Sequence, residues 1–209
     1  IEVSAGAQGQ HWYLEDGDAL AVGYYAGIDT PLPSMVTIAR NQIIRAGAGK
    51  SAYSHAGITL RGVSDQPASL TAEVYDNALI EGNPDPAAAP SHSVGIRAYD
   101  VNARIERNSV AAGFSSHGGG HDAAAVELGW TRYQDNRTFV ELYDNTLTGG
   151  TYGLRVHGAT VQAERNLAFD TVVGVSTHTE YDSTYANNMF FGSQVGCKVG
   201  RTSWDTHSY

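Results

Sequence analysis

Apolar and polar residues alternate along most of this chain in short runs, and the same run returns at regular intervals. The clearest copies end at Asn145, Asn166 and Asn188, which are 21 and 22 residues apart. Eight residues after each of these asparagines, a glycine precedes an apolar-polar-apolar triplet. A fixed period of this length with alternation inside it predicts a solenoid of short β-strands.

Three earlier copies follow the same template, around Asn41, Asn77 and Asn108. Their spacings stretch to 36, 31 and 37 residues. The extra residues fall between the asparagine and the glycine, or just after the triplet. We therefore expect a constant scaffold in which loops absorb the added length.

Alternation also predicts which positions face the interior, because neighbouring side chains in a strand point to opposite faces. Three groups are expected inside: those three residues before the asparagine, those two residues after it, and the two apolar members of each triplet. Cys197 belongs to the last group, so a buried thiol is predicted. Charges of opposite sign alternate at the position before the asparagine and predict an external ladder: Arg40, Asp76, Arg107, Asp144, Arg165 and then Asn187.

The order of glycine, triplet, strand and asparagine over residues 36–199 resembles the repeat of the pectate-lyase-like superfamily, including its NosD-like repeat proteins. The resemblance implies an all-β, right-handed parallel β-helix of about six coils. The asparagines then occupy tight bends, where they tolerate left-handed conformations and stack into an amide ladder. Function is left open, since the superfamily includes polysaccharide lyases, glycoside hydrolases, uronan epimerases, tailspikes and adhesins.

The template divides the chain into three parts. Residues 36–200 are predicted to form the β-helix. Residues 1–35 lack the asparagine template and are expected to be an N-terminal cap or an incomplete first coil, with one strand at 19–23. Residues 201–209 form a C-terminal tail without periodicity. The chain is interpreted as a mature protein or as an excised part of a longer one.

The amino-acid composition excludes some classes of binding partner. The 209 residues include 13 basic and 22 acidic side chains, for a formal charge of −9. This balance argues against nucleic acid, whose phosphates require a basic surface. Since no apolar run reaches membrane-spanning length, membrane insertion is not expected either. Few cysteines and many small residues favour a secreted, periplasmic or cell-surface location.

Candidate chemistry gathers on the outer face of the triplet strands, where the resemblance implies a substrate groove. Four charged side chains project two residues after the glycine (or its equivalent Ala125): Arg97, Glu127, Arg155 and Lys198. Two residues further on lie Tyr99, His157 and His178. Inserted loops that flank this face add His92, His121, Trp130, Arg132 and Tyr133.

These residue types suit proton abstraction from an acidic sugar polymer. Arg97 or Arg155 can pair with a uronate carboxylate, and His157 or His178 titrates in the range needed to remove the C5 proton. Tyr99, Tyr133 or His121 can supply a proton, and Trp130 can stack on a sugar ring. Substrate-binding roles are assigned to the remaining members of the set: Glu127, Arg132, His92 and Lys198. The sequence thus predicts an extracellular lyase or epimerase that acts on an acidic polysaccharide or another glycan.

The alternative is a non-catalytic β-helix segment of an adhesin, fibre or surface assembly that binds glycan or protein. Arg97, Glu127 and Arg155 can neutralise one another in a charge ladder, and the two histidines can simply stack. The Arg-Pro stretch and Asp-rich calcium site of pectate lyases are missing, and only one carboxylate is offered for a two-carboxylate glycosidase.

No cofactor is predicted. Calcium at the acidic turn 15–18 remains an alternative to a solvated turn, and a metal held by loop residues remains a second one. The ligands of that second site would be His92, His117, His121 and Asp122.

Overall fold

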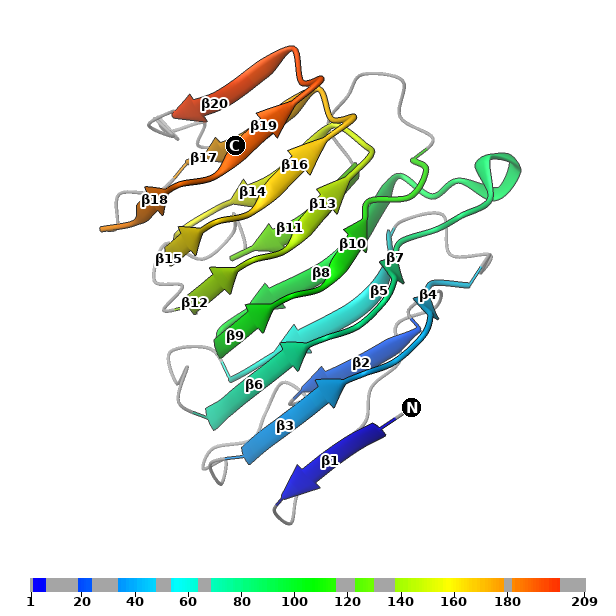
Figure 1. Cartoon of the computed structure of the whole chain (residues 1–209). Helices are drawn as coiled ribbons and strands as arrows, with labels where there is room; N and C mark the ends of the chain where they lie inside the picture. The colour runs from blue at the N-terminus through cyan, green and yellow to red at the C-terminus, as the bar shows by residue number, and fades with distance from the viewer. Residues whose placement is uncertain are drawn as a thin grey trace, which may run out of the picture.

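The computed structural model describes residues 2–6, 19–23, 34–47, 54–63, 69–115, 123–129, 138–178 and 182–199. Within them the chain is a right-handed parallel β-helix with three sheets (Figure 1). The fold class predicted from the repeat is therefore confirmed. Within the described residues, no helix is long and apolar enough to cross a membrane.

Each coil contributes one strand to each sheet, in a fixed order. Sheet 1 carries the triplet strands: β2 (Leu20–Gly23), β5 (Ser54–Arg61), β8 (His92–Tyr99), β11 (Ala123–Leu128), β14 (Tyr152–Val156), β17 (Val173–Thr177) and β20 (Val195–Val199). Sheet 2 carries β1 (Glu2–Gly6) and the strands that lead to each asparagine: β3 (Ser34–Ala39), β6 (Leu70–Tyr75), β9 (Asn102–Glu106), β12 (Thr138–Tyr143), β15 (Ala159–Glu164) and β18 (Thr184–Ala186). Sheet 3 holds short strands: β4 (Ile44–Arg45), β7 (Ile80–Glu81), β10 (Ser109–Ala111), β13 (Thr146–Thr148), β16 (Leu167–Phe169) and β19 (Met189–Phe191).

The first strands of the chain show how the helix begins. The strand expected at 19–23 is observed as β2, which pairs in parallel with β5. β1 pairs with β3 in the antiparallel sense, whereas the strands of the coils pair in parallel. It thereby occupies the edge of β3, whose backbone groups would otherwise be available to another chain. The division of the chain at residues 35 and 200 stays a prediction.

The predicted interior forms one continuous core. Ile38, Val74, Ile105 and Leu142 are completely buried in sheet 2, in register with one another. The triplet positions of sheet 1 face them and are equally buried from β5 to β14. Gly95 brings sheets 1 and 3 into close contact, since a Cβ there would lie 2.4 Å from Cγ1 of Val110. The glycine of the template therefore serves packing.

The asparagines form the buried amide ladder that the repeat predicts. The side-chain oxygen of Asn145 accepts hydrogen bonds from the backbone and side-chain nitrogens of Asn108, at 3.0 and 3.1 Å. Its side-chain nitrogen donates to Asn166 and to the carbonyl oxygens of Ile105 and Tyr143. The same pattern runs from Asn41 to Asn188. Every bend is thereby bonded to the coil beside it.

The left-handed residue of each bend is the one before the asparagine, which corrects the expectation. Its φ lies between 53 and 57° in all six copies: Arg40, Asp76, Arg107, Asp144, Arg165 and Asn187. This geometry turns the chain and lets the asparagine side chain point inward to its neighbours. The charges on these residues pair as predicted. Arg107 forms a bidentate ion pair with Asp76, and Arg165 forms one with Asp144.

Four side chains predicted to be inside lie elsewhere: Ile43, Leu79, Cys197 and Val199. Ile43 is 57% exposed and Leu79 is half-buried, while Ile44 and Ile80 fill the interior instead. The first two bends contain one more residue than the others, so the inward position moves three places beyond the asparagine. Cys197 is exposed, as is every residue of β20, because no further described strand stacks on that edge.

Replacement of a ladder asparagine should destabilise the protein more than loss of an exposed amide. We expect Asn145→Ala to lower the free energy of unfolding by about 2–4 kcal/mol, because several buried polar groups lose their partner at once. The exposed Gln162→Ala in sheet 2 should change it by less than about 0.5 kcal/mol. Urea denaturation followed by circular dichroism measures both. Equal midpoints for the two variants would contradict a stabilising ladder.

Candidate functional site

The outer face of sheet 1 presents two columns of side chains that were predicted to form the site. Strand register aligns Thr59, Arg97, Glu127, Arg155, Ser176 and Lys198 in the central column. Tyr99, His157 and His178 lie two residues further along their strands. Since equivalent residues on neighbouring strands are about 4.8 Å apart, each side chain of the central column lies beside its neighbours. His157 likewise lies beside His178, whereas β11 separates both from Tyr99. The structure thus brings together most of the described residues that were predicted to form the site.

The charged members of the central column bind one another. Glu127 accepts from Nε of Arg97 at 3.4 Å and lies 3.5 Å from Nη1 of Arg155. Arg97 is only 3% exposed, and the Glu127 side chain is 13% exposed. Burial acts to raise the pKa of Glu127, but Arg97, Arg155, His157 and His92 outweigh it and hold that pKa below its usual range. The carboxylate is therefore the fixed negative centre of a cationic cluster.

The two histidines stack face to face. Their ring centroids are 5.4 Å apart and their planes differ by 5°. His157 is 7% exposed, and neither of its ring nitrogens has a hydrogen-bond partner within the described part of the chain. His178 is partly exposed, and its Nε2 lies 3.3 Å from Oγ of the buried Ser176. The pair thus consists of an inner ring without polar partners and an outer ring near the surface.

The same surroundings make both imidazoles less basic. Burial, followed by the positive charge of Arg155, lowers the pKa of His157 to about 4, although Glu127 opposes the change. Burial and the charges of Lys198 and Arg155 also lower the pKa of His178. At neutral pH His157 is therefore uncharged and can accept a proton.

Tyr152 is a member of this site that sequence reasoning missed. The Arg155 guanidinium carbon lies 5.2 Å from the centroid of its ring, and the ring is buried with Ala124 and Val173 in a cluster separate from the core. Tyr152 lies directly before the template glycine, where the alternation of inward and outward side chains changes. This position could have identified Tyr152 from the sequence. A further arginine, Arg61, lies 5.5 Å from the ring centroid of Tyr99, which is itself buried.

The face is buried along much of its length, which differs from the open groove that was expected. Thr59, Arg97, Tyr99 and Ser176 are each less than 9% exposed. Exposure is greater near the last strands, where Arg155 and His178 are partly exposed and Lys198 is exposed. An approaching ligand would therefore meet that end first.

The remaining predicted residues fall into two groups. His92 begins β8, is half-buried and contributes to the low pKa of Glu127, so it lies near the charged column. His121, Trp130, Arg132 and Tyr133 lie outside the described residues, as do His117, Asp122 and the acidic turn 15–18. In the part of the chain that is described, no group of three or more His, Cys, Asp or Glu side chains is placed to hold a metal ion.

The depressed pKa of His157 predicts a specific pH dependence of stability. The unfolded chain takes up this proton near pH 6.5 and the folded chain near pH 4, so stability should fall as the pH drops through that window. The loss from this residue amounts to at most about 3 kcal/mol. In urea titrations from pH 7 to pH 4, His157→Phe should flatten the dependence relative to the unsubstituted protein. An unchanged slope would show that His157 does not titrate in this way.

Comparison with known proteins assigns this chain to no family. No protein-family model, no curated protein and no solved structure matches the chain. The fold assignment accordingly rests on strand register and on the asparagine ladder, and the site rests on the geometry of the outer face of sheet 1.

Proposed function

We propose that this chain is an extracellular β-helix protein of the pectate-lyase-like type that binds an acidic polysaccharide and removes the C5 proton of a uronate residue. The observation that carries the proposal is the partly exposed His178, which stands beside Ser176 on a face where Arg155 and Lys198 occupy the flanking strands. A secreted, periplasmic or cell-surface location fits this substrate class.

The positions of the two cations support binding of a carboxylate. Arg155 and Lys198 lie in register on either side of Ser176, so their backbones are about 9.6 Å apart. Both side chains are long enough to converge on a carboxylate above the serine. Pairing of a uronate carboxylate with such cations stabilises the negative charge that develops when the adjacent C5 proton leaves.

His178 is the better candidate for the base, and His157 is assigned a supporting role. His178 is accessible, whereas His157 is buried and has a pKa of about 4, which makes it a weak base at neutral pH. Lys198 and Arg155 also lower the pKa of His178 in the free protein. A bound carboxylate would neutralise that influence, so the imidazole becomes more basic when the substrate is in place.

Proton removal can lead to two products. In a lyase, the electrons released at C5 form a double bond to C4 while the C4–O bond breaks, and a donor protonates the leaving oxygen. In an epimerase, the donor returns a proton to the opposite face of C5. Tyr99, Tyr133 and His121 remain the candidates for the donor. The two carboxylates of a glycosidase are not offered by the described part of this face, where Glu127 is already held by two arginines.

A second function is favoured by the same ion pairs. Because Arg97, Glu127 and Arg155 neutralise one another, the column also suits a rigid, non-catalytic surface that binds glycan or protein in an adhesin, fibre or surface assembly. Under this alternative Arg155 and Lys198 would contribute to binding without turnover. The two functions differ in whether His178 is needed for chemistry or only contributes contact area.

Incubation with a panel of uronate polymers in heavy water, followed by mass spectrometry, tests the proposal. Shortened chains with an unsaturated terminal uronate would establish a lyase, and deuterium uptake without shortening would establish an epimerase. In either case His178→Gln should reduce turnover by a factor of about 10²–10⁴. Gln162→Ala, on sheet 2, is the matched control and should keep full activity. Unchanged polymers at high protein concentration would rule out catalysis and favour the binding surface.

A further inference from the structure

The outer face of sheet 2 carries the same short motif twice. Glu73 and Tyr75 flank the buried Val74 on β6, and Glu141 and Tyr143 flank the buried Leu142 on β12. The intervening strand β9 brings the two copies into register, since Tyr75 and Tyr143 are both aligned with Glu106. The two copies therefore offer the same pair of groups, a carboxylate and a phenol ring, in different surroundings.

The copy on β12 is occupied by the protein's own arginines. The guanidinium carbons of Arg104 and Arg165 each lie 5.8 Å from the centroid of the Tyr143 ring. Glu141 is among the groups that raise the pKa of Arg104. Stacking of a planar guanidinium on an aromatic ring beside a carboxylate is a favourable arrangement. The chain thus shows which chemical group this motif accommodates.

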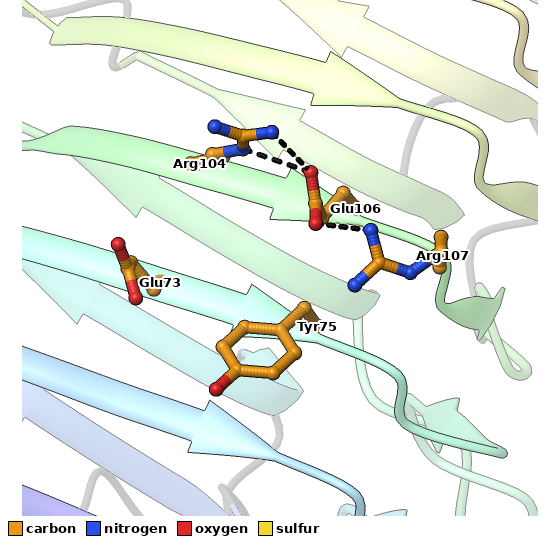
Figure 2. Close-up of a pocket in the computed structure, with 5 residues that line it drawn as sticks. All are labelled: Glu73, Tyr75, Arg104, Glu106 and Arg107. Atoms are coloured by element: carbon orange, nitrogen blue, oxygen red, sulfur yellow. Dashed lines mark hydrogen bonds and ion pairs between the residues drawn. The ribbon is translucent and has the colours of Figure 1, made fainter.

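The copy on β6 has no such partner. Among the described residues, no guanidinium stacks on Tyr75, and the Glu73 carboxylate makes no ion pair or hydrogen bond. Ala39 and Thr37 are the aligned residues on β3, so the strand before β6 supplies no cation in the positions that correspond to Arg104. Tyr75 and Glu73 instead line a surface depression (Figure 2).

The two arginines that line the depression bind carboxylates other than Glu73. Arg104 bonds to Glu106 on its own strand, with its Nε 2.8 Å from Oε2. Arg107 bonds to Glu106 and to Asp76. Figure 2 shows the Arg104 guanidinium turned towards Glu106, away from Glu73. Two carboxylates and two guanidinium groups therefore line the depression, but both arginines bond to Glu106 and neither bonds to Glu73.

We propose that Glu73 and Tyr75 form a binding site for the guanidinium group of an external ligand, namely an arginine side chain of a partner polypeptide. The ring of Tyr75 would stack on the guanidinium, as the ring of Tyr143 does with internal arginines, and Glu73 would accept its N–H groups. Arginine is favoured over lysine because its planar group stacks on a ring and pairs with a carboxylate through two bonds. The formal charge of −9 attracts such a ligand at long range.

This site is independent of the proposed polysaccharide chemistry. It lies on sheet 2, whereas His178 and Arg155 belong to sheet 1. Either proposal can therefore fail without the other.

Titration of the ¹⁵N-labelled protein with N-acetylarginine amide, at matched ionic strength, tests the site by NMR. We expect saturable shifts in the amides of β6 and β9. Glu73→Gln and Tyr75→Leu should each weaken the affinity by at least about threefold, because each removes one favourable contact. Glu141→Gln is the matched control and should leave the affinity unchanged, since that copy already holds arginines. Circular dichroism of each variant checks the fold.

Several outcomes would overturn the proposal. Shifts of equal size with N-acetyllysine amide would show a site for any cation, without preference for guanidinium. Equal loss of affinity in Glu73→Gln and Glu141→Gln would place the binding elsewhere. If phosphate, and not the arginine derivative, moves the same amides, the depression binds anions through Arg104 and Arg107.

Discussion

The stacked asparagine ladder is the constraint on which the rest of this structure depends. Each buried amide bonds to the backbone and to the amide of the neighbouring coil, so the coils keep one register from Asn41 to Asn188. A slip of one residue would expose the core face and leave these groups without partners. The left-handed residue before each asparagine completes the bend and places the external charges in a column.

Because the register is fixed, residues that repeat along the sequence form columns on the surface of the protein. Equivalent residues on neighbouring coils are separated by the distance between adjacent strands, so opposite charges at these positions pair directly, as Asp76 does with Arg107. The same rule aligns Arg97, Glu127 and Arg155 on sheet 1. On sheet 2 it aligns Glu73 with Arg104, but Arg104 bonds to Glu106 on its own strand and Glu73 is left without an ion pair among the described residues. A charged side chain whose aligned neighbour bonds elsewhere therefore marks a place where the surface can accept a ligand.

Burial decides which members of the sheet 1 column can take part in chemistry. Arg97 and His157 carry the residue types expected of a catalytic group, yet both are almost completely covered. The imidazole of His157 is uncharged at neutral pH for the same reason. His178, one strand further on, keeps access to solvent and is still influenced by Arg155 and Lys198. Two histidines in one column thus have different properties because of their depth.

The sequence alone determined the coil, the core and the columns, because an alternation of period two and a repeated asparagine leave few other arrangements of the backbone. It also identified the residues of sheet 1 that lie side by side. It failed at Ile43 and Leu79, where one extra residue in the bend moves the inward position. It also failed at Cys197 and Val199, whose burial depends on a neighbouring coil. The stacking of Arg155 on Tyr152, the burial of Arg97 and the open ring of Tyr75 were decided by the tertiary structure. Each depends on how side chains from coils distant in sequence fill the space around one another.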